Sequence, residues 1–215
     1  MNKKIILIII VIVVICICIG VFLFINNSKI NNGLKENTNN EASKNETDIT
    51  KEENTTNEKN SVVLYFSATG NTKEVAQRIK EASGSDIIEI IPKEKYTAED
   101  LSYNSDDSRA NKEQNDDSAR PQILNNIDIE KYDVIYLGYP IWWGDIPKII
   151  LTLLDTYDFS GKTIIAFCTS GGSSISQSQN TLKTYKNLNV IDGKKFNSSV
   201  TTEEVKSWIS GLNIK

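Results

Sequence analysis

The residues best suited to chemistry lie in three short polar stretches, each directly after an apolar run. The first follows Val62–Phe66 and is rich in hydroxyl groups: Ser67, Ala68, Thr69, Gly70, Asn71 and Thr72. A helical pattern starts at once after it, so free N–H groups and the positive end of the helix dipole would face this loop. Such a strand–loop–helix junction favours phosphate as its ligand. The alternative is an ordinary turn in which Thr69 or Asn71 caps the helix.

Two further stretches offer an aromatic surface and a flexible backbone edge. The second has two adjacent tryptophans, which are costly to expose and present flat faces for stacking: Pro140, Ile141, Trp142, Trp143 and Gly144. The third has paired glycines that let the backbone approach a ligand: Thr169, Ser170, Gly171, Gly172 and Ser173. The alternatives are tryptophans that only plug the end of a sheet, and a flexible turn. Together the stretches predict a site for a flat ring on a phosphorylated chain, and FMN fits this description.

The composition limits what other chemistry the chain could perform. It contains no histidine, which excludes Ser-His-Asp and Cys-His catalysis and removes the commonest zinc ligand. Cys16 and Cys18 lie in an apolar run, and Cys168 is expected to be a buried core residue without a redox role. The formal net charge of −4 argues against a nucleic acid as partner. We therefore predict no catalytic side chain and no metal ligand, so that redox chemistry would belong to a bound cofactor.

Alternating strand and helix patterns are expected to position the three stretches. Apolar runs predict strands over Val62–Phe66, 86–91, 133–138, 163–168 and 189–191. Amphipathic patterns predict helices over 71–83, 146–157, 174–186 and 202–212, the last with a capping box formed by Thr201 and Glu204. This alternation predicts an α/β fold, a parallel sheet with helices on both faces. Ligands bind such sheets beyond the carboxyl ends of the strands, where the three stretches lie.

In order and position, the three stretches resemble the flavodoxin-like family. The closest resemblance is to small FMN-binding flavodoxins and flavin reductases that carry Tyr-Phe-Ser-Ala-Thr-Gly-Asn-Thr, Tyr-Pro-Ile-Trp-Trp-Gly and Thr-Ser-Gly-Gly-Ser, and it covers about residues 61–212. It implies a flavodoxin-like three-layer sandwich with a five-stranded parallel sheet in the order 2-1-3-4-5. It also implies that residues 67 and 69–72 hold the FMN phosphate, while residues 140–143 and 169–172 flank the ring.

Residues 92–130 show no clear periodicity and are long for a loop in a compact domain. The same reductases carry a similar Tyr-Thr-Ala-Glu-Asp-Leu start, and an end seen here as Asn115-Asp116 and Arg120-Pro121. We expect an ordered flap near the flavin. Arg109 and Arg120 are expected to form salt bridges with nearby carboxylates, and contact with a substrate is the alternative.

The first 60 residues predict a membrane anchor and a tether. An apolar stretch from Ile5 to Ile25 follows Lys3 and Lys4, and it is long enough to cross a bilayer as a helix of roughly 20 residues. We predict a transmembrane signal anchor over 1–25, a disordered tether over 26–60 and a flavodoxin-like FMN-binding domain over 61–215. The lysines before the span favour a single-pass protein of the cell membrane whose soluble domain lies outside the cytoplasm.

These features predict a membrane-anchored FMN protein that transfers electrons to or from a redox protein or a small-molecule acceptor. One alternative is an FMN-dependent NAD(P)H oxidoreductase that acts on quinones or similar acceptors, which the flap favours. The absence of a recognisable nicotinamide-binding segment favours the carrier. A third possibility is a cofactor-free scaffold module, against which the hydroxyls of Ser67, Thr69 and Thr72 argue.

Overall fold

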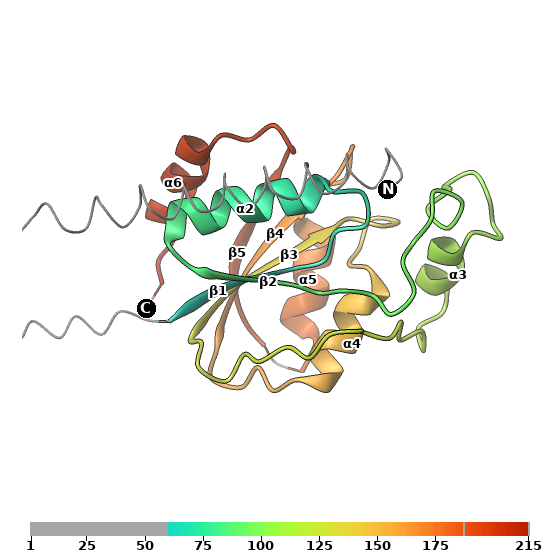
Figure 1. Cartoon of the computed structure of the whole chain (residues 1–215), viewed down its shortest axis with the longest axis horizontal. Coiled ribbons are helices and arrows are strands. Elements are labelled where there is room, and N and C mark those ends of the chain that lie inside the picture. The colour runs from blue at the N-terminus through green and yellow to red at the C-terminus, as the bar shows by residue number, and fades with distance from the viewer. Residues whose placement is uncertain (1–59, 187, 215) are drawn as a thin grey trace, which may run out of the picture. The chain divides into compact units, whose positions relative to one another are not determined.

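The computed structural model describes residues 60–186 and 188–214, which fold into three layers around one parallel sheet. Helices α2 and α6 cover one face of the sheet, and α4 and α5 cover the other (Figure 1). The strand order is β2-β1-β3-β4-β5, and every neighbouring pair runs parallel. The predicted flavodoxin-like α/β fold and its strand order are therefore confirmed.

The strands and helices alternate along the chain with one additional helix between the second and third strands. The strands are β1 (Ser61–Tyr65), β2 (Asp86–Glu89), β3 (Val134–Pro140), β4 (Thr163–Thr169) and β5 (Asn189–Phe196). The helices are α2 (Asn71–Ser83), α3 (Arg109–Asn115), α4 (Lys148–Thr156), α5 (Ser176–Thr184) and α6 (Thr202–Ser210). Thr201 and Glu204 form the predicted capping box at the start of α6.

Most elements begin or end within one or two residues of the prediction, and three differences have identifiable reasons. β5 extends beyond the predicted 189–191. It is an edge strand, and its second half is polar and mostly exposed, so no apolar run marks that half in the sequence. The helix predicted from residue 146 begins only at Lys148, because a tight turn occupies residues 142–145 and Pro147 is the N-cap. Helix α3 was not predicted, since its seven residues carry almost no apolar side chains.

Two cores lie on the two faces of the sheet. The central strands β1, β3 and β4 are buried almost throughout, as expected for a parallel sheet covered on both faces. Cys168, in β4, is fully buried, and burial raises the pKa of its thiol to about 12. At physiological pH this thiol stays protonated inside the core, as expected of a small structural residue.

The flap, residues 92–130, is an ordered part of the domain. Its two ends run side by side, with an antiparallel bridge between Pro92 and Ile123. Arg109 pairs with Glu113 at 2.7 Å. Arg120 pairs with Asp155 of α4, also at 2.7 Å. Both arginines therefore form the salt bridges that the sequence predicted, and the second ties the flap to the body of the domain.

Asp155 joins three segments at this junction, which leads to a prediction about pH. It accepts hydrogen bonds from Arg120 and Tyr185 and pairs with Lys186 at 2.9 Å. These partners, Arg120 first, hold the pKa of the Asp155 carboxyl well below its usual range. The ionised Asp155 carboxylate therefore stabilises the folded state at pH values above roughly 4, the pKa of an aspartate in the unfolded chain. This stabilisation is lost progressively as the pH falls below about 4 towards the lower pKa of the folded state.

Asp155→Asn should therefore lower the free energy of unfolding at pH 7 by about 1 kcal/mol, a modest loss because the carboxylate is partly exposed. Denaturant titration at pH 7 measures this loss. The same titration at pH 3 should give a smaller loss, because part of the stabilisation by the Asp155 carboxylate has already disappeared at that pH. Asp107→Asn is the matched control, because its exposed carboxylate has one lysine partner, Lys112. A loss of equal size at both pH values would show that the charge of Asp155 is not the stabilising factor.

Among the residues that the structure describes, no helix is both long and apolar enough to cross a bilayer. The anchor predicted over 1–25 lies outside the described residues, as does the tether predicted over 26–60 except for Asn60.

Candidate functional site

One cavity of about 380 Å³ lies at the carboxyl ends of the central strands, within the size range of small-molecule sites. All three predicted stretches contribute to its lining: Thr69, Asn71, Pro140, Ile141, Trp142, Trp143, Thr169, Ser170 and Gly171. Other segments add lining residues that the sequence did not suggest: Leu101, Tyr103, Phe196, Asn197 and Ser198. The fold therefore brings the three stretches together at a single site.

The first stretch forms the turn that starts α2. Gly70 is the N-cap residue, with φ +94°, a left-handed conformation that glycine adopts without strain. The hydroxyl of Ser67 accepts hydrogen bonds from the backbone N–H groups of Gly70 and Lys73, at 3.1 and 3.2 Å. Neither Thr69 nor Asn71 caps the helix, so both exposed side chains remain available at the rim of the cavity.

Thr72 has a different position from its neighbours. It is 1% exposed, and its hydroxyl lies 2.8 Å from that of Thr169, at the end of β4. This bond links the first and third stretches beneath the surface of the site. Several other predicted residues also lie outside the lining of the cavity: Ser67, Ala68, Gly70, Gly144, Gly172 and Ser173. Ser67 and Ala68 line a separate cavity of about 150 Å³ together with Glu89 and Tyr96.

The second stretch ends in a tight turn that displays Trp143. Trp142 and Asp145 exchange two backbone hydrogen bonds of 3.0 Å, and the two residues between them have φ values of +48° (Trp143) and +86° (Gly144). This is the pattern of a type I′ turn. Glycine suits the second central position, whereas a bulky residue at the first is uncommon. Strained backbone of this kind occurs often at functional sites.

The two tryptophans have different surroundings. Trp142 is 5% exposed, and its ring packs edge-on against Phe66 and Tyr96 at 5.5 and 4.9 Å. Trp143 is 37% exposed and stacks on Tyr103 of the flap, with 4.5 Å between the ring centroids. The plug interpretation therefore applies to Trp142, and of the two tryptophans only Trp143 presents an exposed surface for stacking.

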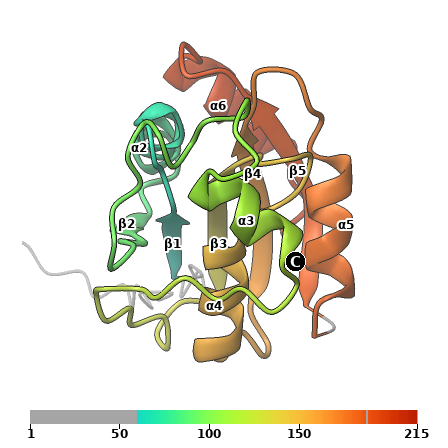
Figure 2. The same ribbon diagram turned by 90° about the vertical axis from the view of Figure 1, so that its right-hand side faces the viewer.

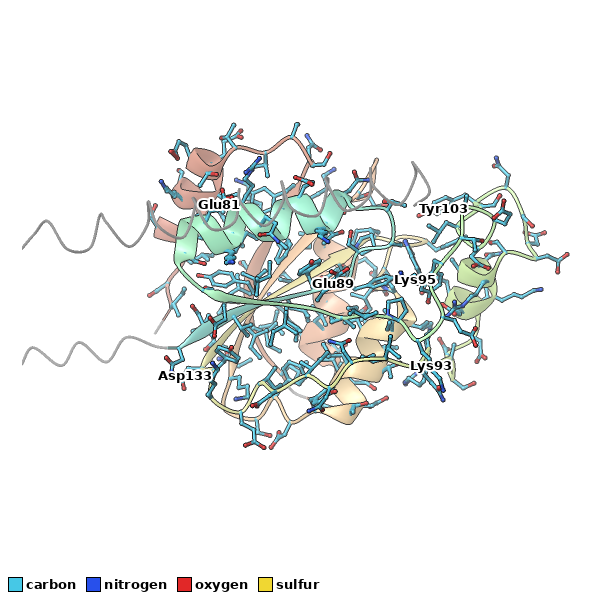
Figure 3. The ribbon with its side chains drawn as sticks, viewed as in Figure 1. Glu81, Glu89, Lys93, Lys95, Tyr103 and Asp133 are labelled. Atoms are coloured by element: carbon cyan, nitrogen blue, oxygen red, sulfur yellow. The ribbon has the colours of Figure 1, made fainter. Side chains whose placement is uncertain are left out.

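Tyr103 and Asn197 show how sequence reasoning missed part of the site. Tyr103 projects from the flap near the carboxyl ends of the strands (Figure 3). Its only sequence signal was an aromatic residue in a long loop rich in Asn and Asp. Asn197 and Ser198 reach the cavity because β5 extends to Phe196, and polar residues after an edge strand give no comparable signal.

The lining residues of this cavity in the described domain include no charged side chain. An anion would therefore depend on hydroxyl groups, backbone N–H groups and the dipole of α2, all of which meet at Thr69 and Asn71. A flat apolar ring would find the exposed face of Trp143 and the backbone edge of Ser170 and Gly171. The geometry thus suits an anion at one end of the cavity and a planar ring at the other.

Comparison with known proteins agrees with this geometry. The sequence profile of the flavodoxin family matches residues 60–212, most of the chain. The chain belongs to the flavodoxin family. The match covers all five strands of the sheet, so the family assignment refers to the whole described domain of this flavodoxin.

Solved structures similar to this flavodoxin include two flavoproteins from Bacteroides species. That of Bacteroides eggerthii is 39% identical with a TM-score of 0.70, over 73% of this chain and 99% of the other. That of Bacteroides uniformis is 42% identical with a TM-score of 0.68, over 71% and 98%. A flavoprotein from Lactobacillus acidophilus, solved in complex with FMN, is 28% identical with a TM-score of 0.57, over 70% and 99%. The chain has no match among the curated proteins.

Proposed function

We propose that this flavodoxin binds FMN in the cavity at the carboxyl ends of the strands and serves as a membrane-anchored electron carrier. The observation that carries the proposal is the meeting of a helix N-terminus and the exposed ring of Trp143 in one cavity of suitable size. The FMN complex of the Lactobacillus acidophilus flavoprotein supports it. FMN, when bound, would supply the one- and two-electron chemistry.

The chain's own residues would bind, orient and shield the cofactor. The Thr69 hydroxyl, the Asn71 amide and the backbone N–H groups of Asn71 and Thr72 at the start of α2 would hold the phosphate without a positive side chain. Trp143 would cover one face of the ring, and Ser170 with Gly171 would border its edge. Because the lining of this cavity carries no charged side chain, the phosphate would not form an ion pair with a lining residue. No side chain of the described domain would take a catalytic role, so the choice of redox partner would depend on access to the flavin ring.

A second candidate is an FMN-dependent NAD(P)H oxidoreductase that acts on quinones or similar small acceptors. The flap favours it, because Leu101 and Tyr103 reach the cavity and enclose it more than the three loops alone would. Figure 2 views the domain from this end, where α3 of the flap lies in front of β3. Such a cover suits a small-molecule substrate better than a protein partner.

Anaerobic reduction separates the two functions. The purified full chain is loaded with FMN, and NADH or NADPH is added without any partner protein. A carrier should keep its visible absorbance, should bleach with dithionite, and should recover its colour when a protein oxidant is added. Bleaching by NADH or NADPH alone, followed by turnover with a quinone, would instead establish the oxidoreductase.

The membrane location rests on residues 1–25 and is a separate part of the proposal. Fusions at the C-terminus test it: alkaline phosphatase is active only outside the cytoplasm, and green fluorescent protein fluoresces reliably only inside. We expect an active phosphatase fusion in the membrane fraction. A fully soluble fusion would contradict the anchor, and a fluorescent membrane-bound one would place the domain inside.

A further inference from the structure

Gln114 of α3 contacts the Trp143 turn without lining the cavity. Its side-chain Nε2 donates to the backbone carbonyl of Trp142 at 3.0 Å and to that of Ile146 at 3.2 Å. These carbonyls flank the type I′ turn, one on each side. A single amide from a distant part of the chain therefore fastens both ends of the segment that displays the Trp143 ring.

The chemistry of the contact fixes the orientation of this amide. Two carbonyl oxygens accept hydrogen bonds and donate none, so the NH₂ group must face them. As a result the Gln114 Oε1 atom, which is buried, has no hydrogen-bond partner among the described residues. A buried acceptor without a partner destabilises a fold. The unpaired Oε1 atom of Gln114 costs stability. We therefore look for the role of Gln114 in the two backbone carbonyls that its NH₂ group binds.

Several contacts hold the helix that carries Gln114 in place. Ser108 caps α3 by accepting from Asn111, and Arg109 pairs with Glu113 while its guanidinium lies 4.0 Å from the centre of the Tyr96 ring. Tyr96 in turn donates to Glu113 at 2.6 Å and packs against Trp142. The amide therefore extends from a fixed helix to the turn, and it can transmit that fixed position to the turn.

We infer that Gln114 is a positioning residue for Trp143. It holds residues 142–146 in the turn that keeps Trp143 at φ +48°, a conformation that a bulky residue rarely adopts by itself. Without the two hydrogen bonds the turn would relax, and the indole ring would leave its place in the cavity. The consequence for FMN rests on the proposed function, whereas the consequence for the Trp143 ring does not.

Gln114→Met tests this, because methionine keeps the length of the side chain and removes both donors. Gln114→Asn, which is too short to reach both carbonyls, is a second variant in case the first folds poorly. Gln122→Met is the matched control, since Gln122 lies on the same flap and its side chain accepts a hydrogen bond from Lys93. All proteins are prepared as the full chain with 5-fluorotryptophan, and Trp143→Phe assigns the Trp143 fluorine signal.

Without FMN, the Gln114 variants should shift or broaden the Trp143 signal and leave that of Trp208 unchanged, and Gln122→Met should alter neither. An unchanged Trp143 signal in both Gln114 variants would overturn the inference. With FMN, the Gln114 variants should bind roughly fivefold more weakly and show a changed reduction potential. A changed Trp143 signal with unaltered affinity and potential would overturn the functional half. If the wild-type chain takes up no FMN, the proposed function fails, but the fluorine signal still decides the role of Gln114.

Discussion

Replacing Trp143 by alanine is expected to weaken FMN binding roughly 30-fold, a loss of about 2 kcal/mol, because the substitution removes the exposed indole face on which the flavin ring is proposed to stack. Trp143→Phe should recover part of this loss, since a smaller flat ring still stacks. Titration of the apoprotein with FMN, followed by quenching of flavin fluorescence, measures both affinities. The fold should be little affected, because the Trp143 side chain lies at the surface of the domain.

Leu124→Ala is the matched control for Trp143. Leu124 is also a large exposed apolar residue, 62% exposed, and it lies away from the proposed FMN site beside a different cavity. Its substitution should leave FMN affinity unchanged. Equal affinity of wild type and Trp143→Ala would exclude Trp143 as a surface for the ring. Equal loss in both variants would indicate a general effect of removing surface apolar groups.

The second large effect is expected from Gly193→Ala in β5, and it concerns stability. A methyl group at this position would overlap the carbonyl oxygen of Ala166 and lie 2.8 Å from its carbonyl carbon, in the neighbouring strand β4. The strand register shifts here, between Ile165 and Phe167, so the two backbones are already in close contact. Because backbone atoms cannot move without disturbing the sheet, we expect a loss of about 3 kcal/mol and a fall in Tm of roughly 6–12 °C.

Gly211→Ala provides the comparison for this effect. Gly211 has φ −85°, and an added methyl group there would lie 3.5 Å from its nearest neighbour, an ordinary contact. The substitution should leave stability unchanged or raise it slightly, because alanine reduces the freedom of the unfolded chain. Thermal unfolding of both variants decides the matter. A difference of only about 1–2 °C between the Tm values of the two variants would contradict the crowding at Ala166. Such a difference corresponds to about 0.5 kcal/mol.

The sheet and its order could be predicted because the central strands are apolar on both faces. Val62–Phe66 and 164–168 are continuous apolar runs, and helices alternate with the strands, which leaves few possible arrangements of the sheet. β5 and α3 could not be predicted in the same way. β5 is a half-exposed edge strand, and α3 is a short polar helix held by Ser108, Arg109 and Glu113. Their positions depend on tertiary contacts that local patterns do not encode.

The site was predictable where a motif follows a central strand. Thr69, Asn71 and Ser170 lie at the cavity because the carboxyl ends of β1 and β4 are neighbours of the end of β3. The separation of Trp142 from Trp143 was not predictable, because it depends on a turn with two positive φ angles. The place of Tyr103 in the cavity lining was not predictable either, since it depends on how the flap packs against the ends of the strands.

Titration of the purified full chain with FMN tests the central claim most directly. We expect saturation at one FMN per chain, quenching of flavin fluorescence, and weaker binding when Thr69 is replaced by valine or Trp143 by alanine. These two substitutions affect the anion end and the ring end of the same cavity. No uptake of FMN by the wild-type chain, or uptake that neither substitution alters, would contradict FMN binding in this cavity.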